Sequence, residues 1–432
     1  MKILLSDASG LTSRQLATIL SRKGHTVHLL TPPGIALTKF TVHVSKVHSV
    51  PPFGVDPYAW LEAALSIITS AKSNGQKGFD VLICTQEQVT ILSAEISRVK
   101  ETGIKIAVPE FRSLRRVMDK VSACETLREI GLKQPESVVL SSSQDLSFSK
   151  YEHLFPAFAK LPIATGSTGV RYVKDGEDLA AVCDAWKPFQ DGGKLLLQNA
   201  ISGPLLMICG VFFHGRLVAW HSCLRAREGI NGGASVKVSM PLPVVGPLME
   251  KLGGGLGWHG GLSLDAILVD KEGGEKELYV IDVNPRIVEP MNGLLAGMDL
   301  VATLLSVSLA EDKERSEEWW DGKVGMGREG IVTHQLLLAI LAAAKQGRLS
   351  IIMEIWGVVS GRGTYKGSVE ELTPLERDWW SAIFLLVLTA MLLVGGRRMV
   401  QKLSGETISN YAVSPSGWRE IVRGQEEKGK GQ

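Results

Sequence analysis

Three oxygen-bearing side chains interrupt two apolar segments in the middle of the chain. Residues 262–268 and 279–286 read as strands joined by a tight turn, and they contain Asp265, Asp282 and Asn284. Asp282 and Asn284 lie two positions apart, so a strand directs both side chains to one face. Two carboxylates and an amide oxygen suit Mg²⁺, which prefers a few protein oxygens together with phosphate oxygens of a substrate. An unpaired carboxylate on an apolar strand is costly, which favours a functional role over a structural one.

A lysine followed by a loop of small residues is the second candidate. Residues 155–160 form an apolar segment that ends in Lys160, and residues 164–170 are small and rich in glycine. Small residues let backbone N–H groups approach phosphate oxygens, and a lysine adds a positive charge. The loop residues that would make this approach are Gly166, Ser167, Thr168 and Gly169. A tight hairpin without a ligand is the alternative interpretation.

Two further segments carry weaker signals. Lys120 follows Asp119 at the start of a helical pattern, although an exposed lysine on a helix is most often a solvated charge. Residues 195–197 are an apolar strand that runs into a polar kink, as in pockets that present backbone groups to an adenine edge. Ordinary edge strands show the same pattern. The residues of the kink are Gln198, Asn199, Ala200 and Ile201.

The N-terminal part of the chain predicts a parallel sheet. Residues 3–5 read as a strand, helical spacing follows as far as Gly24, and a second strand starts at Val27. This order of strand, helix and strand is typical of a parallel sheet with helices on its faces. The first turn contains only Gly10, whereas a dinucleotide-binding turn needs several glycines. We therefore interpret this unit as structural.

The elements that follow extend this arrangement. Residues 79–84 and 104–108 predict two more strands of the same sheet, and Pro109 closes the segment. A helical pattern covers 113–131. Residues 155–290 then alternate strands with glycine-rich loops, which is typical of an antiparallel sheet.

The C-terminal region is apolar in two places beyond a charged linker at 311–318. Residues 331–344 are too short to span a bilayer and predict a buried helix. Residues 379–396 are uncharged and long enough to reach the threshold for a span, with two tryptophans at their start and arginines after them. A span, a helix on the membrane surface and a helix packed on the body all remain open. We expect residues 425–432 to be disordered.

Composition excludes some classes of protein. A net charge of +2 over 432 residues gives no argument for a nucleic-acid partner. The five cysteines are dispersed, without the spacing of a zinc site, and read as reduced thiols of a cytoplasmic protein. No export signal is visible at the N-terminus.

Taken together, these residues resemble the ATP-grasp superfamily over residues 1–310. The resemblance implies an α/β chain with a Rossmann-like parallel sheet at 1–110. An α+β ATP-grasp domain with an antiparallel sheet would occupy 111–310, and a helical C-terminal region would occupy 311–432.

The same resemblance implies roles for the candidate residues. Lys120 and Lys160 would hold the phosphates of ATP, and residues 198–201 would line the adenine. Arg286 would stabilise the transferring phosphoryl group or an acyl phosphate. One or two Mg²⁺ ions, with Mn²⁺ as the alternative metal, would be bound by Asp265, Asp282 and Asn284.

The reaction implied is phosphorylation of a carboxylate by ATP, followed by attack of an amine or another nucleophile on the acyl phosphate. Small-molecule carboxylates and amines are thus the expected partners, and a homo-oligomer is left open. Arg225 and Arg227, close to the loop 231–235, are candidates for a carboxylate clamp, although surface arginines near such loops are common.

Some positions depart from the family pattern. Leu161 separates Lys160 from the following proline, and Asp282 is shorter than the usual glutamate. Asn199 and Pro204 stand where acidic residues are common. The alternative hypothesis is therefore a membrane-associated, nucleotide-binding regulatory or scaffold protein whose ligase chemistry has lapsed.

Overall fold

The computed structural model describes most of the chain. The described ranges are 1–34, 36–73, 77–142, 145, 148–165, 168–310, 324–374, 378–406 and 408–430. Two of the predicted loop residues, Gly166 and Ser167, and the linker 311–318 lie outside these ranges.

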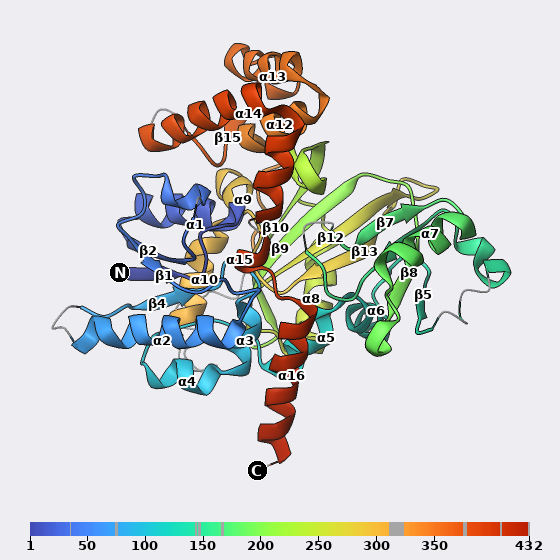
Figure 1. Cartoon of the computed structure of the whole chain (residues 1–432), viewed down its shortest axis with the longest axis horizontal. Coiled ribbons are helices and arrows are strands. Elements are labelled where there is room, and N and C mark those ends of the chain that lie inside the picture. The colour runs from blue at the N-terminus through green and yellow to red at the C-terminus, as the bar shows by residue number, and fades with distance from the viewer. Residues whose placement is uncertain are drawn as a thin grey trace.

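The N-terminal part forms the predicted parallel sheet, with four strands in the order β3-β2-β1-β4 (Figure 1). The strands are β1 (Lys2–Leu5), β2 (Thr26–Thr31), β3 (Lys46–Ser49) and β4 (Val81–Ile83). The helices of this part are α1 (Leu11–Arg22), α2 (Pro57–Ser73), α3 (Val89–Ala94) and α4 (Ile96–Glu101). Alternate residues of the strands enter two apolar clusters, one with α1 and the other with α2 and α3.

The strand predicted at 104–108 is wrong. This segment meets β4 through a single bridge between Val81 and Lys105. Its next residues turn toward the large sheet instead, where the carbonyl of Ala107 approaches Gly260 so closely that a Cβ there would lie 2.5 Å away.

The helical pattern at 113–131 forms two helices, α5 (Phe111–Met118) and α6 (Lys120–Ile130). Asp119 between them has extended backbone angles, and its carboxylate accepts hydrogen bonds from the backbone N–H groups of Val121 and Ser122. This N-cap fixes Lys120 as the first residue of α6. Gly131 ends the helix in the left-handed conformation, at φ 72°.

Two sheets follow. The small sheet is antiparallel, in the order β5-β8-β6-β7. Its strands are β5 (Ser137–Leu140), β6 (Ala157–Lys160), β7 (Val170–Val173) and β8 (Leu195–Asn199). The helix α7 (Gly176–Trp186) packs on it, and Leu179 of this helix is fully buried in the apolar cluster of the small sheet.

The large sheet has seven strands in the order β13-β12-β9-β10-β11-β14-β15, and all neighbours are antiparallel except β14 and β15. Its strands are β9 (Leu205–Phe213), β10 (Arg216–Glu228), β11 (Ala234–Ser239), β12 (Gly260–Asp270), β13 (Lys276–Asn284), β14 (Val332–His334) and β15 (Val369–Glu370). Three helices accompany it, α8 (Val245–Leu256), α9 (Met291–Leu295) and α10 (Leu300–Leu309). Because α10 shares one apolar cluster with both β1 and β9, it joins the large sheet to the parallel sheet.

The C-terminal region completes the large sheet and then forms helices. The predicted helix at 331–344 begins as β14, and the helix itself is α12 (Leu336–Gln346). The remaining helices are α13 (Arg348–Ser360), α14 (Trp379–Glu406), α15 (Ile408–Tyr411) and α16 (Pro415–Lys430). Figure 1 shows α12, α13 and α14 together at one end of the molecule.

The expectation of a disordered tail is wrong for residues 425–430. They belong to α16, whose Gln425 donates a hydrogen bond to the carbonyl of Ala94, while Lys428 pairs with Glu95. The polar composition of these residues therefore belongs to a helix that packs on the N-terminal part, and not to a chain without structure.

The apolar helix α14 has two unlike faces. Leu385, Leu388 and Leu392 are buried in a cluster with α12. Leu386 and Val394, on the other side, are 70% and 80% exposed. By length and composition, residues 379–396 are long and apolar enough to cross a membrane, and 22% of this stretch is buried. Packing accounts for one face, and membrane association stays a prediction.

Candidate active site

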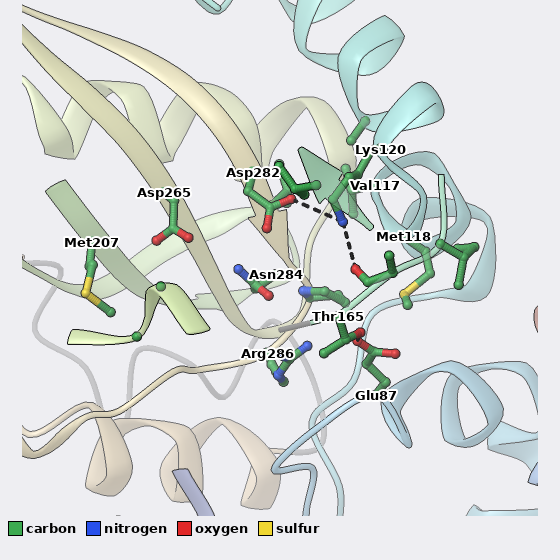
Figure 2. A pocket seen from close by; sticks show the side chains of 18 of the residues that line it. Glu87, Val117, Met118, Lys120, Thr165, Met207, Asp265, Asp282, Asn284 and Arg286 are labelled. Carbon is green, nitrogen blue, oxygen red and sulfur yellow. Dashed lines mark hydrogen bonds and ion pairs between the residues drawn. The ribbon is translucent and has the colours of Figure 1, made fainter. Parts of the chain in front are cut away.

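A cavity of about 240 Å³ lies where the small and large sheets meet (Figure 2). Its wall includes Lys120 from α6, Thr165 from the loop after β6, Asp265 from β12 and Asp282 from β13. Arg286, two residues beyond the end of β13, closes one side. The structure thus brings together five positions that come from four separate segments of the chain.

Asp265 and Asp282 are directly opposite each other on neighbouring strands, and Asn284 follows on the same strand as Asp282. Burial raises the pKa of the Asp265 carboxyl to about 7, and the adjacent charge of Asp282 contributes to this rise. Two facing carboxylates in this environment favour a bound cation, since a cation would stabilise both in their ionised form.

The donor set fits Mg²⁺ only if a ligand supplies further oxygens. Among the residues that the structure describes, no group of three or more His, Cys, Asp or Glu side chains could hold a metal ion. Mg²⁺ usually binds one or two carboxylates and completes its shell with water and substrate phosphates. Asp265, Asp282 and Asn284 match that requirement, and Mn²⁺ would accept the same donors.

Lys120 reaches the same cavity from the other side. Its Nζ donates a hydrogen bond of 2.9 Å to the carbonyl of Ala164 and lies 3.9 Å from Asp282 Oδ1. The N-cap of α6 sets the position of the backbone, and the side chain remains 15% exposed. Figure 2 shows this ammonium between the loop and the carboxylates, where it can meet a phosphate group.

Lys160 lies behind the cavity wall and connects the two sheets. Its Nζ donates hydrogen bonds to Gln198 Oε1 at 2.7 Å and to the carbonyl of Ile281 at 2.9 Å. Burial lowers the pKa of Lys160 to about 8, and the negative charge of Asp282 partly offsets this effect. The ammonium is therefore close to losing its proton in mildly alkaline solution.

The loop after Lys160 is closely packed where the structure describes it. Thr168 donates a hydrogen bond from Oγ1 to the carbonyl of Thr165. A Cβ on Gly169 would lie 2.3 Å from Cβ of Ala164, so only glycine fits there. Phosphate binding by this loop stays a prediction, because its central residues lie outside the described ranges.

The predicted adenine residues do not line the cavity, although the structure describes all four of them. Gln198 is occupied by Lys160, and the side-chain amide of Asn199 donates to the carbonyl of Leu154. Ala200 and Ile201 follow at the end of β8. Their contact with a base stays a prediction.

The two arginines of the predicted carboxylate clamp contact different parts of the chain. Arg227 forms a bidentate pair with Glu354 of α13 and also donates to Tyr365. Arg225 donates to the carbonyl of Gly232, which lines the cavity. Arg227 therefore fastens the C-terminal region to β10, whereas Arg225 lies next to the candidate site.

Arg286 has the surroundings expected of a ligand-binding cation. Its side chain is only 9% exposed, and its Nε has no hydrogen-bond partner among the described residues. The Nε is closed off from the cavity, but the residue lines it, so an anionic ligand there would meet the rest of the guanidinium.

A buried group of charges beside the cavity was not predicted. Lys237 of β11 lies 2.7 Å from Glu289 and 2.5 Å from Glu371, and Gln335 donates to both carboxylates. Burial alone would lower the pKa of Lys237, but the two facing carboxylates raise it. A charged residue in an apolar strand is the signal that could have identified Lys237, in the same way that it identified Asp265.

Comparison with known proteins gives a distant relationship in sequence. No protein-family profile matches the chain. The large chain of carbamoyl phosphate synthase from Thermus thermophilus is 22% identical over 198 residues, which are 44% of this chain and 19% of that protein. The chain thus matches about a fifth of the length of these curated relatives.

Solved structures give a closer relationship in fold. The biotin carboxylase domain of Hydrogenobacter thermophilus 2-oxoglutarate carboxylase, in complex with MgADP, ADP and bicarbonate, superposes with a TM-score of 0.55 at 18% identity, over 77% of this chain and 73% of that one. The N5-carboxyaminoimidazole ribonucleotide synthetase PurK, as its ADP complex, gives 0.56 at 11% identity, over 83% and 84%. An L-amino acid ligase from Bacillus licheniformis gives 0.53 at 15% identity, over 75% and 77%.

These three structures share the ATP-grasp fold, and this chain has the same fold. The predicted fold class, a parallel N-terminal sheet followed by antiparallel sheets and helices, is confirmed.

Proposed function

We propose that the chain is an ATP-dependent ligase that activates a carboxylate as an acyl phosphate for attack by an amine or another nucleophile. The observation that supports this most directly is the composition of one cavity wall, where Lys120, two facing aspartates and Arg286 meet. The solved structures with this fold that are complexed with MgADP or ADP support the choice of nucleotide and metal.

Each residue has a distinct role in this proposal. Lys120 binds the phosphates of ATP at the cavity wall. Lys160, whose ammonium is held behind the wall by Gln198 and Ile281, turns toward the phosphates when the nucleotide binds. Asp265 and Asp282 would hold Mg²⁺, which neutralises phosphate charge when bound. A carboxylate oxygen of the substrate attacks the terminal phosphorus, and ADP leaves. Arg286 stabilises the negative charge on the phosphoryl group during this transfer.

The second step releases phosphate. The nucleophile attacks the carbonyl carbon of the acyl phosphate, the bond to the phosphate oxygen breaks, and the nucleophile loses a proton. Glu289 lines the same cavity and is the candidate to accept that proton. Arg225 donates a hydrogen bond to the carbonyl of Gly232 in the wall, so it is a candidate for positioning the loop 231–235.

The alternative is a nucleotide-binding regulatory or scaffold protein without ligase chemistry. It is favoured by Asn199 at a position where a carboxylate is common, since the amide of Asn199 is directed to a backbone carbonyl. Retention of Asp265, Asp282 and Arg286 favours the ligase, because a lapsed site does not need them.

Thermal unfolding with ATP, with and without Mg²⁺, tests the site. A ligand at 100 times its dissociation constant adds about 2.7 kcal/mol of stability if it binds only the folded state. We expect this gain with Mg-ATP in the wild type and in the control variant Asp270→Ala. Asp270 is an exposed carboxylate at the end of β12 that pairs with Lys276. Asp282→Ala should lose most of the gain.

Release of ADP in the presence of pooled carboxylates and amines tests the reaction. Stimulation by one carboxylate pool, increased further by an amine pool, supports the ligase. If Mg-ATP stabilises the chain but no pool stimulates ADP release, the ligase is excluded and the regulatory alternative is adopted.

A further inference from the structure

A second cavity, of about 360 Å³, adjoins the candidate active site. The two cavities have part of their wall in common, so ligands bound in them would contact the same residues. The shared residues are Thr165, Asn231, Gly233, Arg286 and Glu289.

The wall away from this shared end is largely apolar. It is formed by Leu338 and Leu341 of α12, Phe384 and Leu388 of α14, and Leu37 of the N-terminal part. All five belong to or pack against one apolar cluster, which is built mainly by the C-terminal helices. The C-terminal region therefore supplies much of the wall of a cavity that adjoins the candidate site.

Charge is confined to one end of this cavity. Among the described residues that line it, only Arg286 and Glu289 carry a charge, and both belong to the shared wall. The remaining polar residues of the wall are neutral. Small-molecule sites commonly have this composition, with an apolar body and a few convergent polar groups that fix the orientation of the ligand.

A charged group at the far end would lose its hydration without gaining a partner, which is costly. An apolar group there would instead gain from leaving water and from contact with leucine side chains. At the shared end the requirement is reversed, because Arg286 lines both cavities there and its guanidinium can pair with a carboxylate.

We propose that the second cavity binds the body of an apolar carboxylic acid whose carboxylate reaches Arg286 at the shared wall. The inference rests on the proposed function and specifies its substrate class. The carboxylate then lies at the boundary with the nucleotide cavity, where phosphoryl transfer to it would take place, and the aliphatic or aromatic part lies among the C-terminal helices.

Calorimetric binding to the full-length chain with Mg-ADP present tests this without turnover. The ligands are acetate, butanoate, hexanoate, octanoate and octanedioate, which is as long as octanoate but has a charge at each end. We expect the dissociation constant to fall by about fourfold per methylene group that enters the cavity. Octanedioate should bind no better than butanoate.

A pair of matched variants locates the binding. Leu341→Trp fills the cavity from α12 and should weaken octanoate binding at least tenfold while leaving acetate binding unchanged. Leu349→Trp introduces the same side chain at a position of α13 that is 76% exposed, and it should bind octanoate as the wild type does. The ligand series on the wild type remains decisive if Leu341→Trp does not fold.

The outcomes separate the two proposals. Equal binding of acetate and octanoate, or equal binding of octanoate and octanedioate, would overturn the apolar-acid cavity even if ADP release is stimulated by another carboxylate. Tight, Leu341-dependent binding of octanoate without ADP release in the presence of any amine supports the cavity but refutes the ligase.

Discussion

The depressed pKa of Lys160 gives the most direct test of its assigned role. In the proposed role the ammonium form would bind a nucleotide phosphate, and with a pKa of about 8 this form is lost as the pH rises above 8. If only the ammonium form binds well, the apparent dissociation constant of ADP should rise about eightfold between pH 7.5 and pH 9.

The assay is calorimetric titration with Mg-ADP at several pH values between 7 and 9.5. The control is Lys160→Met, which has no titrating group at this position and should bind more weakly at pH 7.5 but with little change up to pH 9. The unliganded wild type provides a second measurement. Because the unfolded chain binds more protons than the folded chain between pH 8 and 10.5, this group should make the free energy of unfolding increase with pH in that range.

Two results would refute this reasoning. An affinity for Mg-ADP that stays constant from pH 7.5 to 9 in the wild type would show that the ammonium of Lys160 does not contact phosphate or does not titrate there. An equal pH dependence in Lys160→Met would assign the effect to another group.

Three further predictions concern stability, each measured by urea unfolding. Burial raises the pKa of Asp7 to about 6, so the stability that this group contributes is greatest at low pH and is lost as the pH rises through 6. In the wild type this loss lowers the free energy of unfolding by about 1.4 kcal/mol between pH 5 and pH 8, and Asp7→Asn should abolish it. A variant with the same pH profile as the wild type would contradict this. Lys237→Met leaves two buried carboxylates without their cation and should lower the free energy of unfolding by about 3–5 kcal/mol. Glu371→Gln keeps one cation with one anion and should lower it clearly less. Equal losses of stability in the two variants would argue against the pairing. Gly169→Ala forces a methyl group against Ala164 and should cost about 1–3 kcal/mol, and no loss would mean that the loop has room there.

The sequence predicted the parts of the site that depend on local pattern. Asp265 and Asp282 stand out because a carboxylate in an apolar strand needs a partner, and the hairpin that pairs them is short. Lys120 depends on the N-cap at Asp119, which is also local. These features need no knowledge of how distant segments pack.

Long-range contacts could not be predicted in the same way. Glu371 meets Lys237 only because β15 joins the far edge of the large sheet, and a two-residue strand has no periodicity to detect. The pairing of Arg227 with Glu354 likewise joins β10 to a helix that is more than a hundred positions away. The apolar runs of the C-terminal region predicted helices, but periodicity cannot distinguish a cavity wall from a core or a membrane-facing surface.

The way in which the large sheet ends has a consequence for solubility. Without β14 and β15, its edge would be β11 (Ala234–Ser239), which is almost entirely buried in the structure. An open strand of this kind exposes a row of unpaired N–H and C=O groups to other chains. The natural edge on this side of the sheet is instead the two-residue β15, which contains Glu370 and is too short to serve as a template. A chain shortened before residue 331 is thus expected to aggregate through β11, because the C-terminal region covers this edge as well as lining the second cavity.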